Sequence, residues 1–185
     1  ANRSGDIAIG YSSTSGTYTS TQNSNDLEGE NISLGNWSTA YGGQALAVGN
    51  HAEATAKSSM ALGIGSRAYG VESLSIGSDS TSSGNNSLAI GSDSTATGVD
   101  AQAIGNSATA SGESSLAIGS HASSSDKQSF AVGYKAQATK ADTVALGTQA
   151  KAQADRALSF GYNSSATKND AIAMGSNAKA QGMSS

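Results

Sequence analysis

Apolar and polar positions alternate with a period of two in short stretches of the chain, and these stretches recur every 14 residues. In one such stretch the large residues Leu88 and Ile90 alternate with Ser87 and Ala89. In the next stretch, 94–97, small residues alternate with threonine. Because side chains point to opposite faces of a strand in turn, this alternation predicts β-strands. Each repeat is therefore predicted to contain two short strands.

A glycine follows the first predicted strand of every repeat. The members of this column are each 14 residues apart: Gly35, Gly49, Gly63, Gly77, Gly91, Gly105, Gly119, Gly133, Gly147, Gly161 and Gly175. Gly10 precedes Gly35 by one period plus an insertion. We expect a corner at each glycine, where a positive φ or a close backbone approach excludes a Cβ. A second, less demanding corner is expected half a period later.

This repeat predicts an all-β parallel β-roll, a solenoid in which each coil stacks on the one before it. About twelve coils at ~4.8 Å, the spacing of hydrogen-bonded strands, would form a rod with ladders of equivalent residues. The residue pattern leaves the handedness of the coil open. The chain has no Pro, which suits a sheet that uses nearly all its N–H donors, and no Cys, which excludes a disulfide scaffold.

The first predicted strand is apolar on both faces, with Ala or Ser on one and large residues on the other. A lone two-sheet roll covers only the inner face, so we expect identical chains to self-associate through the other. We favour small residues inside the roll and large ones at a symmetry axis, although the opposite assignment also fits. The candidate interface residues are Leu88, Ile90, Gln102, Ile104, Leu116 and Ile118. The polar Gln102 is either a tolerated substitution or part of a polar layer between subunits.

The insertion is a candidate recognition site, because protruding loops on a rigid scaffold often bind partners. It contains the acidic residues Asp26, Glu28 and Glu30, whose spacing matches no calcium-binding loop known to us. The alternative is a tolerated insertion or a cap over the first coil.

Three aromatic residues near the same end, Trp37, Tyr41 and Tyr69, fall in columns that we expect to face outward. Exposed aromatic side chains are favoured binding anchors. The alternative is that they pack beneath the insertion and close the end of the roll.

Composition and motifs argue against several other classes of protein. The net charge is −4 and the basic residues are scattered, so no nucleic-acid partner is expected. No catalytic Ser/His/Asp set, Cys/His cluster or phosphate-binding loop is evident. We expect a protein that is not an enzyme and that needs no metal or cofactor.

The motif Ser-Leu-Ala-Ile-Gly-Ser, at 87–92 and 115–120, resembles the head repeat of YadA-like trimeric autotransporter adhesins. Variants recur across almost the whole chain, for example at 45–49 and 171–175. The resemblance implies a left-handed parallel β-roll, a homotrimer, and display beyond the outer membrane of a Gram-negative bacterium. It also implies binding to host matrix proteins such as collagen, fibronectin or laminin, and attachment to other bacterial cells.

We therefore expect one head domain over residues 1–185, with an inserted loop at about 18–28. No signal peptide, neck, stalk or membrane anchor is recognised, so the sequence is expected to be an excised head that contacts a membrane only through a missing anchor. The alternative function is an ice-binding solenoid that uses the Thr/Ser ladder at Thr81, Thr95, Thr109 and Ser123. An enzyme on a solenoid scaffold is the least favoured class.

Overall fold

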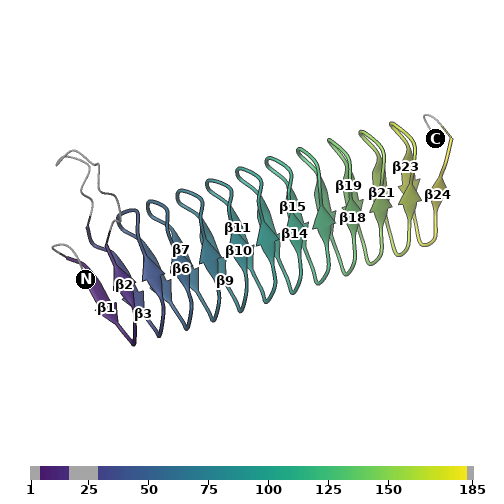
Figure 1. The fold of residues 1–185 in the computed structure, drawn as a ribbon. Helices are drawn as coiled ribbons and strands as arrows, with labels where there is room; N and C mark the ends of the chain where they lie inside the picture. The colour runs from purple at the N-terminus through teal and green to yellow at the C-terminus, as the bar shows by residue number, and fades with distance from the viewer. Residues whose placement is uncertain (1–4, 17–28, 183–185) are drawn as a thin grey trace.

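The computed structural model describes residues 5–16 and 29–182, which wind into a solenoid of two parallel sheets (Figure 1). Each coil contributes one strand to each 12-stranded sheet, and neighbours in a sheet are the equivalent strands of consecutive coils. The first sheet comprises β1 (Ile7–Ile9), β3 (Ile32–Leu34), β5 (Leu46–Val48), β7 (Met60–Leu62), β9 (Leu74–Ile76), β11 (Leu88–Ile90), β13 (Gln102–Ile104), β15 (Leu116–Ile118), β17 (Phe130–Val132), β19 (Val144–Leu146), β21 (Leu158–Phe160) and β23 (Ile172–Met174). The second sheet comprises β2 (Thr14–Ser15), β4 (Thr39–Ala40), β6 (Glu53–Ala54), β8 (Arg67–Ala68), β10 (Thr81–Ser82), β12 (Thr95–Ala96), β14 (Thr109–Ala110), β16 (Ser123–Ser124), β18 (Gln137–Ala138), β20 (Lys151–Ala152), β22 (Ser165–Ala166) and β24 (Lys179–Ala180).

The strands pair in the register that the 14-residue repeat predicts. Leu88 pairs with Gln102, and Gln102 pairs with Leu116. The expectation of an all-β parallel solenoid is confirmed. The strands are shorter than the sequence pattern suggested, with three residues in each strand of the first sheet and two in each strand of the second. The backbone hydrogen bonding nevertheless extends beyond them, since the N–H of Thr97 donates to the carbonyl of Ala110 at 2.9 Å.

The interior of the roll contains only small side chains. Every buried hydrophobic residue in the described part of the chain is an alanine, and most of the buried polar residues are serines. In β11, for example, Ala89 is fully buried while Leu88 and Ile90 face outward. The structure thus has the favoured arrangement, with the small residues inside and the large aliphatic residues outside.

Some of the serine hydroxyls in this interior have hydrogen-bond partners within the coil, whereas five buried ones, Ser82 and Ser124 among them, have none in the described part of the chain. Ser75 and Ser80 lie on opposite sides of the roll, and their Oγ atoms are 2.7 Å apart. The Ser80 hydroxyl also donates to the carbonyl of Gly77 at 3.0 Å. Satisfied hydroxyls of this kind avoid the free-energy cost of burying an unpaired polar group.

The corners impose an unusual backbone conformation twice in every coil. The glycines of the first corner have φ values between 115 and 140°. Shortly after each corner a second position has positive φ, usually without a glycine, as at Asp93 (57°) and Asp100 (57°). Asp, Asn and Ser are frequent there, in keeping with the ability of short polar side chains to tolerate the left-handed region. The two corners share this left-handed position but differ at the corner glycine itself, since Gly91 of the first corner has a positive φ and Gly98 of the second does not.

The pairing continues across the insertion without losing register. Ile7 pairs with Ile32, so the extra residues lie between β2 and β3. The fully buried Asn31 joins the strands on either side. Its side-chain amide donates to Asp6 Oδ1 at 3.1 Å, and its Oδ1 accepts the N–H groups of Gly43 and Ala45, both at 3.1 Å. Residues 17–28 lie outside the described part of the chain.

Stacking of the coils leaves no space for a Cβ at the corner glycines, and substitution of Gly105 tests this. A Cβ at Gly105 would lie 2.6 Å from the backbone of Gly119, whereas one at Gly175 would meet nothing within 4 Å. Both positions have positive φ, so the comparison isolates the stacking contact. We expect G105A to lower the free energy of unfolding by about 2 kcal/mol more than G175A does. Denaturant unfolding followed by circular dichroism measures this, and equal effects would contradict it.

Candidate functional site

The outward side chains of the first sheet form a continuous apolar surface, which we call the apolar face. Leu88, Ile90, Ile104, Leu116 and Ile118 are each half-buried in the single chain. The row continues to Phe130, which is 40% exposed, and to Ile172, which is 51% exposed. The adjacent coils bury the edges of these side chains but leave their outer surfaces uncovered.

Gln102 interrupts the apolar face in β13. It is exposed and pairs in register with Leu88 and Leu116. Its amide is therefore flanked along the ladder by two aliphatic side chains, neither of which can hydrogen-bond to it.

The outward side chains of the second sheet are polar. Thr81, Thr95, Thr109 and Ser123 are half-buried and lie in register on four consecutive strands. The row is bounded by Arg67 on one side and Gln137 on the other.

Trp37 belongs to an aromatic stack at the N-terminal end, which comprises Tyr11, Trp37 and His51. The rings of Trp37 and His51 are nearly parallel, with an interplanar angle of 11° and centroids 5.1 Å apart. Tyr11 contacts Trp37 edge-on, with centroids 5.4 Å apart. Trp37 is 47% exposed, so the stack presents aromatic surface to solvent. Tyr11 and His51 were not among the predicted site residues. The sequence does hold a signal for His51, since it lies one full repeat after Trp37 and therefore on the adjacent coil.

Tyr41 and Tyr69 lie at the other end of the second-sheet strands, apart from this stack. Tyr41 is half-buried and Tyr69 is 41% exposed. The Tyr69 hydroxyl donates a hydrogen bond to the carboxylate of Glu53. Partial burial and this bond to a carboxylate raise the pKa of Tyr69 to about 12. The three aromatic residues predicted as one group are therefore in two places.

The acidic residues of the insertion are only partly described. Asp26 and Glu28 lie outside the described residues, and Glu30 is exposed with a φ of 66°. Within 5–16 and 29–182, no three His, Asp or Glu side chains gather closely enough to bind a metal ion.

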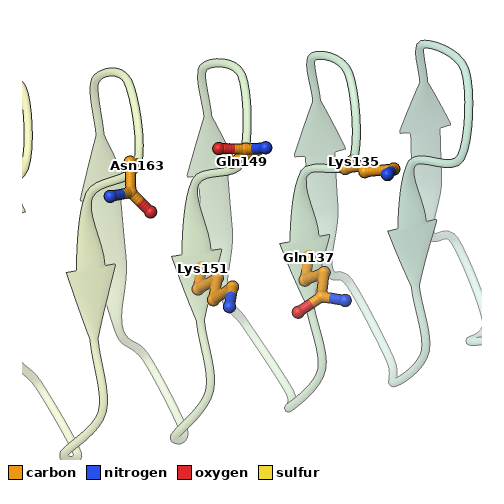
Figure 2. Close-up of a pocket in the computed structure, with 5 residues that line it drawn as sticks. All are labelled: Lys135, Gln137, Gln149, Lys151 and Asn163. Atoms are coloured by element: carbon orange, nitrogen blue, oxygen red, sulfur yellow. The ribbon is translucent and has the colours of Figure 1, made fainter.

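A shallow depression of about 280 Å³ lies on the second sheet towards the C-terminal end, and we call it the lysine depression. Figure 2 shows Gln137 and Lys151 on the neighbouring strands β18 and β20, with Lys135, Gln149 and Asn163 on the turns beside them. The depression is lined by two cations and three amides and by no carboxylate. Lys135 is held over the ring of Tyr134, with its Nζ 5.1 Å from the centroid. The lysine depression was not predicted from the sequence, because its residues come from two columns of the repeat and from three coils.

At the second corner, in contrast to the lysine depression, a basic side chain is paired with a carboxylate. Arg156 binds Asp170 in the next coil through two contacts, Nε to Oδ1 at 2.6 Å and a terminal nitrogen to Oδ2 at 2.9 Å. The hydrogen bond and the charge of Arg156 hold the pKa of Asp170 below its ordinary value. Both side chains are exposed to solvent. The ion pair therefore contributes little to the stability of the fold.

Comparison with known families identifies the repeat. The model of the YadA head domain repeat matches residues 32–52, 54–80, 68–94, 96–122, 110–136, 124–150, 138–164 and 166–185, well over half of the chain. The chain belongs to the YadA head-repeat family. The resemblance expected from the Ser-Leu-Ala-Ile-Gly-Ser motif is therefore confirmed.

Among solved structures, the chain is similar to the collagen-binding domain of the Yersinia adhesin YadA. The two share 22% sequence identity with a TM-score of 0.40, and the match covers 98% of this chain and 78% of the other. At that level the comparison adds no argument to the family match. No curated protein matches the chain significantly. The described residues contain no helix of the length and hydrophobicity needed to cross a bilayer.

Titration of Tyr69 tests the geometry of its contact with Glu53. In the E53Q variant, we expect the pKa of Tyr69 to fall from about 12 towards the ordinary value of 10.0, because the neighbouring negative charge is removed. Since folding raises this pKa, the contact stabilises the fold fully below pH 10, and that contribution is lost as the pH rises through about 12. Ultraviolet titration of the tyrosines, with Y69F assigning the signal and E72Q as the control, measures the shift. An unchanged pKa in E53Q would contradict the contact.

Proposed function

We propose that this chain is the head of an adhesin on the surface of a Gram-negative bacterium and that it acts as a homotrimer. The observation that carries the proposal is the match of YadA head repeats along most of the chain. The proposed role is attachment to host extracellular-matrix proteins, with autoagglutination of bacterial cells as a further consequence of the same surface. A binding role also agrees with a rod that displays repeated polar rows along its second sheet.

Assembly through the apolar face is supported by the burial pattern. Leu88, Ile90, Ile104, Leu116 and Ile118 keep their outer surfaces in contact with solvent in the single chain. Uncovered aliphatic surface costs roughly 25 cal/mol per Å², so a ladder that runs along the rod strongly favours association. Around a cyclic symmetry axis, the apolar face of each chain would contact the apolar faces of its copies. Such an assembly is closed and does not extend into an open-ended filament.

Gln102 is proposed to supply a polar layer within this interface. Its amide is exposed in the single chain and lies between aliphatic neighbours. Amides from symmetry-related chains can donate to and accept from one another, which satisfies their hydrogen bonding in a buried setting. One polar layer in an otherwise apolar seam also favours a single register between subunits.

Collagen, fibronectin and laminin are the proposed ligands, and the similar Yersinia domain is described as collagen-binding. An extended partner can contact many coils of a rod at once, so weak contacts add through high effective concentration. The proposed anchors are Trp37 in the aromatic stack and, separately, Tyr41 and Tyr69. The acidic residues Asp26, Glu28 and Glu30 of the insertion are proposed as further contacts.

Sedimentation of a charged variant tests the assembly. We expect the wild-type chain to sediment as a trimer and I104D to sediment as a monomer, because the substitution places charges that repel one another in the apolar seam. The control T109D carries the same new charge on the outward surface of the second sheet and should stay trimeric. A wild-type monomer, or an equal loss of assembly in both variants, would contradict the proposal.

Binding to immobilised collagen, fibronectin and laminin tests the aromatic anchor. We expect W37A to weaken binding to at least one of them by about tenfold, as for the loss of a central aromatic contact. The control is Y162A, which removes an aromatic side chain with 55% exposure near the other end of the rod. If no matrix protein binds the wild type, or if W37A binds as the wild type does, the proposed ligand or the proposed anchor is wrong.

A further inference from the structure

Charge is distributed unevenly along the rod. Residues 1–113 carry ten acidic and three basic side chains, whereas residues 114–185 carry four acidic and seven basic ones. The overall charge of −4 therefore conceals a negative N-terminal part and a positive C-terminal part. An anionic partner that the N-terminal part repels is attracted to the C-terminal coils.

Within the C-terminal part, the charges are also separated around the coil. All four carboxylates, Asp126, Asp142, Asp155 and Asp170, lie at the second corner. Four of the basic residues lie at the same corner and balance them: Lys127, Lys140, Arg156 and Lys168. This corner is therefore close to neutral and includes the pair of Arg156 with Asp170.

The remaining three lysines lie on the first corner and the second sheet, where the C-terminal coils carry no carboxylate. Lys135 is on the turn before β18, and Lys151 and Lys179 are in β20 and β24. Lys151 and Lys179 both pair in register with Ser165, so two strand spacings separate them, about 10 Å. Lys135 and Lys151 are exposed and line the lysine depression together with Gln137, Gln149 and Asn163 (Figure 2).

We propose that the lysine depression and the strip leading to Lys179 bind an acidic polysaccharide, a sugar polymer that carries sulfate or carboxylate groups. The lysines match the recurring negative charges of such a chain, and the side-chain amides donate to and accept from sugar hydroxyls. An extended polymer suits a strip that crosses successive coils better than a compact anion does.

Nucleic acid is a poorer match to the same surface. The chain has a pI of about 5.0. Nucleic-acid-binding domains usually present a far more basic face. The strip also lies on the outward side of the second sheet, away from the apolar face, so the site is complete in one chain and does not depend on the proposed trimer.

Two triple variants of equal charge test the site. In K135Q/K151Q/K179Q the strip loses its cations, and in K127Q/K140Q/K168Q the second corner loses three lysines, all of them exposed. Binding of the 185-residue chain to immobilised heparin is measured at physiological ionic strength, with circular dichroism to establish that both variants are folded. We expect the first variant to lose about tenfold in affinity, the summed effect of three exposed ion pairs, and the second to lose less than about threefold.

Further ligands identify the chemistry that is recognised. Hyaluronate carries carboxylates but no sulfates, so it separates recognition of carboxylate from recognition of sulfate. Binding of both polymers assigns the site to anionic sugars in general. Binding of heparin alone assigns the site to sulfated sugars. Neutral dextran should not bind. The proposal is overturned if heparin does not bind the wild type, if the two variants lose equal affinity, or if single-stranded DNA binds as tightly as heparin. Collagen binding and assembly of the first variant are measured alongside, so that this result stands separately from the adhesin proposal.

Discussion

The interior of the roll is so thin that nearly all the side chains buried in the described part of the chain are Ala or Ser, with Asn31 and Thr143 as larger exceptions. Two sheets that face one another at such close range exclude large aliphatic and aromatic side chains from the core. The large aliphatic residues of the first sheet are therefore on the outside, where a water-soluble protein would ordinarily carry polar residues. The apolar face follows from this one constraint.

A core of methyl groups and hydroxyls buries little apolar area per residue, so the backbone hydrogen bonds between coils carry much of the fold. Their regularity explains why the register is unbroken from β1 to β24, even where the insertion adds residues between β2 and β3. It also explains why outward positions tolerate different residues. Thr95 and Lys151 occupy equivalent outward positions of different coils, and the next residue, which is buried, is alanine in both. The rod can therefore carry different surfaces on different coils, with an aromatic stack near one end and a lysine depression nearer the other.

Most of the fold could be predicted from the sequence because its signals repeat. Period-two alternation identifies strands, and the regular glycine spacing identifies their register. The positive φ at Asp93 and Asp100 could not be foreseen, since Asp also occurs in ordinary turns. Which side of the first strand faces inward was also open, because both of its faces are apolar, and only the packing of Ala89 against the other sheet decides it.

The candidate surfaces were less predictable, because they join residues from different columns. Trp37 was a predicted anchor, and its spacing of one repeat from His51 could have indicated that stacking partner. Tyr11 is not in the same column, so its contact with Trp37 is known only from the structure. The sequence separation of Lys135 and Lys151 is not a multiple of the repeat, so the ladder does not relate them. The acidic group at Asp26 and Glu28 lies outside the described residues and remains a prediction.

An experimental structure of the assembled chain tests the central claim most directly. It should show identical chains in contact through the row of Ile90, Ile104 and Ile118, with Ala and Ser filling each roll and Gln102 meeting its symmetry-related copies. Isolated rods with that isoleucine row in contact with solvent would contradict the account.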